Sequence, residues 1–350
     1  MKYLSKILEV SLFCSVVLSS ASFAQVITFV DFEKDQLGAY TNSAALQDFV
    51  PKTGAKKWYA MEQNGGQNAS IIENGEHGKV LRLFYPKGCI GPNDEPTVAC
   101  AGQVMNPLPV DVPADTMWVG YDVFFEEGFD FVKGGKLPGL CGGNCPTGGE
   151  RPSIGDGWSA RLMWRSSGRV VQYLYFVDQA STYGDDIPYN LNGTIPQKQF
   201  VPGQWHRVVS KITMNTVNVE GAGEKDGTIK TWFDGELVVD LDTMRWRDFN
   251  NVHIDIFYIS TFHGGSDASW APSVDSYAQF DNFEISLDSV AVVKKAEEPE
   301  QPSAIKNRGF GVNTQNSKFK APSIFYKADG SKTERPPENR KPHRPVYFKK

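Results

Sequence analysis

The sequence predicts an all-β fold, an antiparallel two-sheet β-sandwich or jelly roll, followed by a disordered C-terminal tail. Between residues 25 and 292, short runs rich in Val, Ile, Thr and aromatic residues alternate with Gly, Pro, Asn and Asp, as in strands joined by turns. No long stretch there has the 3.6-residue apolar period of a helix. From residue 293 onward the chain is rich in Pro, charged and small polar residues, which cannot bury enough surface to fold alone.

Ten runs are long enough to be strands, and many antiparallel strands in one domain of this length favour two packed sheets. The runs are 27–32, 79–85, 117–125, 158–165, 170–177, 205–214, 228–233, 236–241, 253–261 and 278–287. Asp234 and Gly235 lie between two of them and suit a type I′ hairpin turn, because both central residues of that turn need a positive φ.

A second hairpin is predicted around the segment Ser166–Gly168. This segment suits a three-residue loop with Gly168 in the left-handed conformation. Arg165 then pairs with Arg169 across the loop. Because burial of one face fixes the pairing of the two strands, we expect no slip from this register.

The strands of this hairpin have two different faces, because successive side chains alternate. Counting back from the loop places Arg161 opposite Tyr173 and Ser159 opposite Tyr175. The apolar face, which must meet the core, carries Ala160, Leu162, Trp164, Leu174 and Phe176. The polar face carries Ser159, Arg161, Met163, Arg165, Tyr173 and Tyr175. Alternation alone leaves two interpretations open: an exposed surface on which Arg and Tyr pair across strands, or a surface for a ligand.

Upstream, residues 133–140 read KGGKLPGL, which we interpret as a glycine-rich loop carrying Lys133 and Lys136. Glycines allow the backbone to approach a ligand closely. A nucleotide-binding loop would need the Gly-x4-Gly-Lys-Ser/Thr spacing and a following helix. The sequence has neither, so we do not expect a nucleotide site.

Five residues resemble the active-site set of the family 14 polysaccharide lyases, which act on alginate and glucuronan: Lys136, Ser159, Arg161, Tyr173 and Tyr175. The resemblance lies in the KLPGL segment, the SAR tripeptide of WSARLMWR and the Y-x-Y of QYLYF. Weaker similarity lies in WFDGE (232–236), STFHGGSDASWAP (260–272) and FDNFEIS (280–286). The resemblance to this family extends over about residues 25–290 and implies a concanavalin A-like jelly roll with lyase activity.

Elimination across a 4-linked uronate explains these residue types. The C6 carboxylate must be neutralised before the C5 proton can leave, and Arg161 and Lys136 are the candidate cations. The departing O4 then needs a proton. Tyr173 or Tyr175 is expected to act as base and then as acid, if neighbouring cations lower the phenol pKa from about 10. The other tyrosine would hold the sugar together with Ser159, and a desolvated Lys136 is an alternative base.

Other residues are candidates for binding neighbouring sugars. Lys133, Arg165 and Arg169 could extend the cationic cleft to further uronates. His263 stands beside two glycines and near Trp270, and we expect it on a cleft loop. Aromatic and histidine side chains of that loop could stack on sugars or hydrogen-bond them. The alternative is that His263 has a structural role, because a lone histidine is more often structural than functional.

The first 24 residues have the pattern of a secretory signal: a basic start, an apolar run, and small residues before a cleavage site after Ala24. No later stretch approaches the roughly 20 continuous apolar residues of a membrane span. We therefore expect a secreted or periplasmic protein, with a lyase domain at 25–292 and a basic disordered tail at 293–350.

Four cysteines follow the leader, an even number in a chain bound for an oxidising compartment, and they predict disulfides. We prefer the pairs Cys89–Cys100 and Cys141–Cys145 because each closes a short loop, although four cysteines allow three connectivities. The spacing typical of zinc ligands is missing from the sequence, so we expect no metal and no other cofactor.

The net charge of −5 hides an asymmetry along the chain. From Lys294 onward, 14 Lys and Arg stand against 6 Asp and Glu, so the tail carries +8 and the remainder −13. An acidic body can bind a polyanion only through a local cluster of cations. We expect an acidic polysaccharide as the partner, no nucleic acid, and a monomer.

Two other functions are alternatives. A jelly-roll glycoside hydrolase needs two suitably placed carboxylates, but Glu126 and Glu127 are adjacent and point to opposite faces of a strand. A non-catalytic, lectin-like carbohydrate-binding module would keep the sheet and lose the chemistry. The retained lysine, arginine and tyrosines argue against it.

Overall fold

The computed structural model describes residues 26–49, 68–75, 77–91, 103–107 and 114–292, together with the short strands β17 (Phe325–Tyr326) and β18 (Lys332–Thr333). The chain divides into two units, Met1–Ala296 and Glu297–Lys350. Within the second unit, β17 and β18 pair antiparallel. The expected leader and most of the expected tail lie outside the described residues, so both remain predictions.

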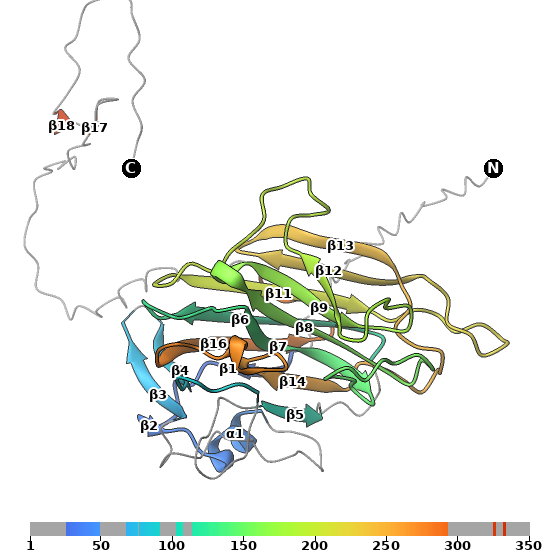
Figure 1. The fold of residues 1–350 in the computed structure, drawn as a ribbon, viewed down its shortest axis with the longest axis horizontal. Helices are drawn as coiled ribbons and strands as arrows, with labels where there is room; N and C mark the ends of the chain where they lie inside the picture. Colours follow the sequence, from blue (N-terminus) through green and yellow to red (C-terminus); the bar gives the residue numbers. More distant parts are fainter. Residues whose placement is uncertain are drawn as a thin grey trace, which may run out of the picture. The chain divides into compact units, whose positions relative to one another are not determined.

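The described residues of the first unit form strands, one short α-helix and two 3-10 turns (Figure 1). The larger sheet contains β1 (Val26–Val30), β2 (Gly38–Ala39), β3 (Ala69–Asn74), β4 (Gly78–Tyr85), β6 (Thr116–Phe125), β11 (Trp205–Thr213), β12 (Gly227–Phe233), β13 (Glu236–Met244) and β16 (Ser276–Ser286). The smaller sheet contains β5 (Gln103–Pro107), β7 (Gly134–Gly143), β8 (Gly157–Arg165), β9 (Val170–Tyr175), β10 (Asp185–Pro188), β14 (Ile256–Ser260) and β15 (Phe262–His263). Each of the ten predicted runs overlaps one of these strands.

The two sheets form the antiparallel sandwich that the sequence predicts. The larger has the order β13-β12-β11-β6-β16-β4-β3-β2, and β1 pairs with β16. The smaller has the order β10-β9-β8-β7-β14-β5, and β15 pairs with β7. Helix α1 (Asn42–Asp48) begins after Thr41, whose side chain accepts the Ala44 N–H. In the part of the chain that the structure describes, no helix has the length and apolar character needed to cross a membrane.

Both predicted hairpins form. Asp234 and Gly235 form the turn that joins β12 to β13, and both have the expected positive φ, +51° and +85°. In the other hairpin, Gly168 is left-handed as expected, and Ser167 is left-handed as well, with φ of +59°. Arg165 N–H donates to the Arg169 carbonyl at 2.7 Å, which closes the loop.

The register of β8 and β9 places the two predicted faces on opposite sides of the smaller sheet. Arg161 lies opposite Tyr173 and Ser159 opposite Tyr175. The core between the sheets takes the apolar face, with Trp158, Ala160, Leu162, Trp164 and Leu174 buried. The polar face therefore points away from the core.

The KLPGL segment is part of strand β7, which corrects its interpretation as a loop. The register of β7 against β8 shifts between Leu137 and Leu140, and Pro138 and Gly139 form a bulge. Proline cannot donate to the ladder, and a Cβ on Gly139 would lie 2.1 Å from the Ala160 carbonyl oxygen. The bulge lets Leu137 and Leu140 both enter the core, while Lys136 points to the other side.

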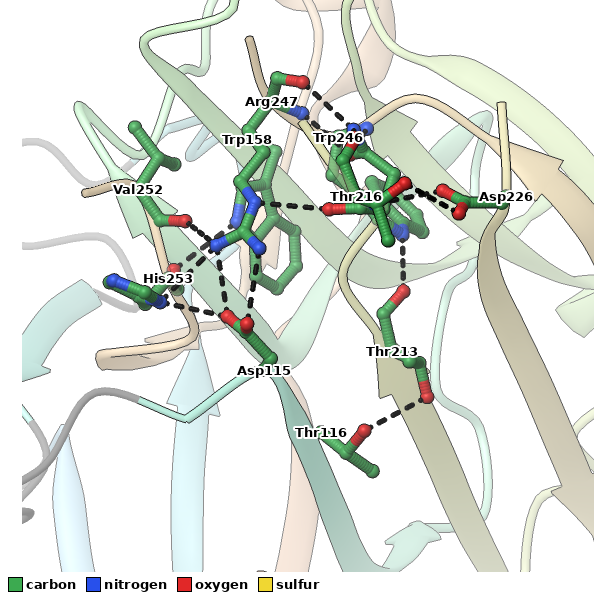
Figure 2. Close-up of polar contacts among 11 residues, drawn as sticks. Asp115, Thr116, Trp158, Thr213, Thr216, Asp226, Trp246, Arg247, Val252 and His253 are labelled. Atoms are coloured by element: carbon green, nitrogen blue, oxygen red, sulfur yellow. Dashed lines mark hydrogen bonds and ion pairs between the residues drawn. The ribbon is translucent and has the colours of Figure 1, made fainter. Parts of the chain in front are cut away.

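Polar side chains join the two sheets at one end of the sandwich (Figure 2). Arg247 is buried and reaches Asp115, just before β6, through Nη1 at 2.9 Å and Nη2 at 3.1 Å. It also donates to the Val252 carbonyl at 2.6 Å, and His253 Nδ1 lies 2.8 Å from Asp115 Oδ1. This network ties the segment before β6 to the segment before β14.

Cys141 and Cys145 are joined by a disulfide, the pair expected from the sequence. Cys89 is also disulfide-bonded. Its expected partner, Cys100, lies outside the described residues.

Candidate active site

A pocket of about 570 Å³ opens on the face of the smaller sheet that points away from the core. Four neighbouring strands supply side chains to its floor. Lys136 comes from β7, Arg161 from β8, Tyr173 and Tyr175 from β9, and Tyr258 from β14. The structure thus brings together all four residues predicted to be catalytic.

Arg161 is a buried cation with no carboxylate partner among the described residues. The side chain is 1% exposed, its Nη1 donates to Ser260 Oγ at 3.2 Å, and its Nε has no hydrogen-bond partner in the part of the chain that the structure describes. Its guanidinium carbon lies 4.8 Å from the centroid of the Tyr258 ring. A buried charge without a counter-ion costs free energy, so this guanidinium is suited to bind an anionic group that enters the pocket.

Lys136 is held in surroundings that favour its neutral form. Its Nζ donates to Met163 Sδ at 2.8 Å. Burial lowers the pKa of Lys136 well below its ordinary value, and the charges of Arg161 and Arg165 lower it further. An amine that is neutral at lower pH than an ordinary lysine can accept a proton from a substrate.

The two tyrosines stand side by side on β9, with their phenol oxygens 3.5 Å apart. Each oxygen accepts one backbone N–H at 3.1 Å, Tyr173 from Gly184 and Tyr175 from Gly149. Burial raises the pKa of the Tyr173 phenol, and the opposing effect of Arg161 is smaller. Arg161 thus lowers this pKa, as the sequence argument requires of a neighbouring cation, but burial outweighs it, and the condition for a phenolate base is not met at Tyr173.

The rim of the pocket carries aromatic and cationic groups. Trp270, in a short 3-10 turn, and Tyr183, which is 56% exposed, both line the pocket. The Arg165 guanidinium carbon lies 5.9 Å from the Trp270 ring centroid, and Arg165 Nε donates to Asp186 at 2.8 Å. Lys133 Nζ also lies 5.9 Å from the Trp270 centroid. Arg165 therefore lines the pocket and Lys133 stands next to its rim, while Arg169 is exposed and does not line it.

Ser159 does not line the pocket, contrary to its expected role in holding a sugar. The side chain is fully buried, and its hydroxyl donates to the Pro146 carbonyl at 2.8 Å. The residue lies on the predicted face, but the segment that follows the disulfide covers it.

His263 lies in β15 and belongs to the core, which corrects its placement on a cleft loop. Its ring is 2% exposed and stacks on Phe129, with 5.4 Å between the centroids. Its Nε2 lies 2.7 Å from the Asp130 carbonyl oxygen. Burial lowers the pKa of His263 to about 4. Pairing of His263 with Gly135 of β7 places the ring beneath the sheet.

Sequence reasoning did not assign Tyr258 or Tyr183 to the site. Tyr258 lies in a predicted strand, but alternation along that strand cannot say which face meets the core until its neighbour is known. Tyr183 lies in a connection between strands, where alternation carries no signal. Trp270 lines the pocket, in the segment where the sequence predicts aromatic side chains that could stack on sugars.

No carboxylate lines the pocket in the described part of the chain. One possible metal-binding cluster, His77 with Asp122 and Asp281, belongs instead to the larger sheet, and its ligand atoms lie within 4.8 Å of one another. Arg207 Nη1 lies 3.2 Å from Asp122, and the Asn282 amide donates to both carboxylates at 2.8 and 2.9 Å. These carboxylates are therefore already held by hydrogen bonds.

Comparison with protein families matches residues 73–283 to the family described as Polysaccharide lyase 14. No curated protein sequence matches the chain.

Solved structures share the fold. Alginate lyase Aly36B is 26% identical, with a TM-score of 0.55 over 74% of this chain and 95% of that one. A double mutant of Aly36B in complex with alginate tetrasaccharide is 25% identical, with a TM-score of 0.57 over the same shares of the two chains. The marine PL-14 alginate lyase from Aplysia kurodai is 27% identical, with a TM-score of 0.55 over 71% of this chain and 97% of that one.

Proposed function

The chain belongs to polysaccharide lyase family 14 and is a polysaccharide lyase, and we propose that it cleaves a 4-linked uronate polymer, alginate or glucuronan, by β-elimination. The observation that carries this proposal is a pocket in which a buried guanidinium, with no carboxylate partner among the described residues, stands with an amine and two phenols. Alginate is the first substrate to test, because the relatives at 25–27% identity are named alginate lyases.

Arg161 is assigned to the C6 carboxylate of the uronate. A planar guanidinium can bind a carboxylate through two parallel hydrogen bonds, and the unpartnered Nε gives this side chain a donor to spare. When the C5 proton leaves, negative charge builds up on the carboxylate. A fixed cation in a dry pocket stabilises that charge without any reorganisation.

Lys136 is assigned as the base. Its neutral amine takes the C5 proton, the electron pair of the C5–H bond becomes the C4–C5 double bond, and the C4–O4 bond breaks. The lowered pKa of Lys136 favours this role, and the raised pKa of Tyr173 argues against a phenolate base there. This assignment replaces the tyrosine base preferred on sequence grounds with its stated alternative.

The phenols are assigned to the leaving group. As the C4–O4 bond breaks, Tyr173 or Tyr175 donates its proton to O4, so that a hydroxyl departs instead of an alkoxide. The phenolate is reprotonated by solvent or by the Lys136 ammonium, which resets the site. The proposed mechanism assigns every charge to a side chain of this protein and needs no metal ion.

The two alternative functions have weaker support. A hydrolase would need a pair of carboxylates at the reacting bond, and the described residues that line the pocket include none. A lectin-like module has no use for an amine whose pKa is lowered by burial beside two cations.

One assay separates these functions. Purified protein is incubated with alginate, polyglucuronate and a neutral glucan, and the ultraviolet absorbance of the new C4–C5 double bond is followed. We expect absorbance to rise with a uronate polymer only, at an unchanged rate after dialysis against EDTA. New reducing ends without absorbance would indicate hydrolysis, and neither signal with any uronate polymer would refute lyase activity.

We also propose that the protein acts outside the cytoplasm. The predicted leader and the Cys141–Cys145 disulfide both suit an oxidising compartment. Expression in the native host followed by N-terminal sequencing should find a mature chain that begins at Gln25, and a chain that keeps Met1 would contradict export by cleavage.

A further inference from the structure

Two connecting segments lie over the tyrosines, and each donates one backbone N–H to one phenol oxygen. The 146–149 segment supplies Gly149, whose N–H lies 3.1 Å from Tyr175 Oη. The 179–184 segment supplies Gly184, whose N–H lies 3.1 Å from Tyr173 Oη. The two phenols thus have equivalent donors from separate parts of the chain.

The 146–149 segment is fixed by a disulfide and by a hydrogen bond from a buried serine. The Cys141–Cys145 disulfide closes the turn just before it. The buried Ser159 hydroxyl then holds the Pro146 carbonyl at 2.8 Å, which sets where the segment starts. Gly149 has a φ of +96°, a conformation that other residues rarely adopt, so its N–H reaches the Tyr175 oxygen.

The 179–184 segment is held by the buried amide of Gln179, together with hydrogen bonds from Arg151 to the Gln179 carbonyl and from Ser181 to the Tyr183 carbonyl. Gln179 is 1% exposed, and its Oε1 accepts the Phe176 N–H at 3.2 Å. Its Nε2 donates to the carbonyls of Ser181 and Tyr183 at 3.0 and 3.3 Å. Gln179 therefore holds both ends of this turn and places Gly184 next to Tyr173.

Position 184 has no room for a side chain. A Cβ there would lie 2.8 Å from Tyr175 Cε2 and 2.9 Å from the Leu174 carbonyl oxygen. The backbone of this segment therefore packs directly against the β9 side chains, and any added atom must move it away.

These contacts constrain where the phenol protons point. A phenol oxygen that accepts a backbone N–H keeps its own O–H for another acceptor. At 3.5 Å the two phenols are at the limit of a hydrogen bond and bind each other only weakly. Their protons are left to be donated to a group in the pocket.

We propose that Ser159 and Gln179 are positioning residues, each of which fixes a segment whose backbone N–H orients one of the two phenols for proton donation to the substrate. This inference rests on the proposed lyase function. It reassigns Ser159 from sugar binding to support of Tyr175, and it gives Gln179 the same duty toward Tyr173.

The test compares Ser159→Ala and Gln179→Ala with Ser210→Ala. Ser210 is equally buried, but its hydroxyl bonds Thr231 at 3.0 Å in the larger sheet, away from the pocket. We expect kcat on the preferred uronate polymer to fall about 100-fold in Ser159→Ala and Gln179→Ala, since small misplacements of reacting groups cost that much. KM should change less than about threefold, because neither side chain touches the substrate. Ser210→Ala should keep the wild-type kcat.

The outcomes distinguish this inference from the proposed function. An inactive wild-type protein would refute the lyase function itself. An active wild type whose Ser159→Ala and Gln179→Ala variants keep kcat, or lose it together with Ser210→Ala, would overturn the positioning role alone. If either alanine variant fails to fold, Gly184→Ala decides, because displacement of the Gly184 N–H should lower kcat with little change in KM, and an unchanged kcat would contradict the proposal.

Discussion

Lys136 Nζ lies 4.0 Å from the centroid of the Tyr173 ring, so the amine and the phenol meet at one point of the pocket although β8 separates their strands. Three neighbouring strands are therefore needed to assemble the base, the carboxylate-binding cation and the proton donor.

The acidic limb of the pH profile of kcat/KM should move in opposite directions in two variants. Lys136 accepts a proton only when neutral, and Arg165 lowers its pKa while Asp186 raises it. Arg165→Gln should therefore shift the limb to higher pH and Asp186→Asn to lower pH, measured at constant ionic strength. Lys136→Arg should be inactive throughout, because a guanidinium stays protonated. Shifts of the same sign would contradict a Lys136 base.

Removal of the Arg161 charge should abolish activity without destabilising the fold. The buried guanidinium has no carboxylate partner in the described residues, so Arg161→Leu should raise the free energy of unfolding by about 1 kcal/mol or more. Arg207 is the matched control, because it contacts Asp122 and Glu284 at 3.2 and 3.4 Å. Arg207→Leu should cost about 3 kcal/mol. Denaturant titration measures the free energy of unfolding of both variants. An equal loss of stability in the two would show that Arg161 is an ordinary structural cation.

Loss of either active-site hydroxyl should slow turnover. Tyr173→Phe and Tyr175→Phe should each lower kcat about 100-fold, the usual contribution of a positioned proton donor. Tyr189→Phe is the control, because its buried hydroxyl donates to Gln172 at 3.0 Å on the core side of the sheet. That variant should lose about 1 kcal/mol of stability and keep its kcat. Wild-type turnover in both active-site variants would remove the phenols from the mechanism.

The rim tryptophan should affect binding more than chemistry. Trp270 lines the pocket beside Arg165 and is not one of the four residues assigned to the reaction, so Trp270→Ala should raise KM about tenfold and change kcat little. Trp118→Ala is the control, since Trp118 is partly exposed on the larger sheet and stacks on Trp232 at 5.3 Å. A fall in kcat with unchanged KM would place Trp270 in the reaction instead.

His263 should make stability depend on pH without contributing to catalysis. Its pKa is lowered from 6.5 to about 4 in the folded protein, so the unfolded chain binds its proton more readily. The contribution of the neutral His263 ring to the free energy of unfolding is complete above about pH 6.5. It is lost as the pH falls through about 4, and the total loss is about 3 kcal/mol.

The measurement is the difference in unfolding free energy between wild type and His263→Phe from pH 7 to pH 4. We expect the difference to vary across this range in the direction of a wild type that weakens in acid. kcat at neutral pH should be unchanged in His263→Phe. A pH-independent difference would show that the ring is not held neutral.

Local sequence alone was enough to predict the β8–β9 hairpin and the residues that share its polar face. Trp164 and Leu162 must be buried, and side chains alternate strictly, so a slip of one residue would expose both. The loop chemistry of Ser166–Gly168 then sets the register. Arg161 opposite Tyr173 follows from these local rules, without knowledge of any other strand.

Strand β7 could not be recognised in the same way. Its glycines and Pro138 have the composition of a loop, and they form a strand only because the Ala160 carbonyl of β8 approaches Gly139 too closely for any side chain. The partner strand decides this pairing.

Which segments cover the polar face, and how far they exclude water from it, depends on contacts between distant parts of the chain. Ser159 shares the polar face with Arg161, but the 146–149 segment covers it, and β15 carries His263 into the core. The lowered pKa of Lys136 and the raised pKa of Tyr173 depend on burial by residues far away in the chain. Alternation is a local property of a strand, whereas burial and the pKa values it sets are produced by the segments that fold over the strand.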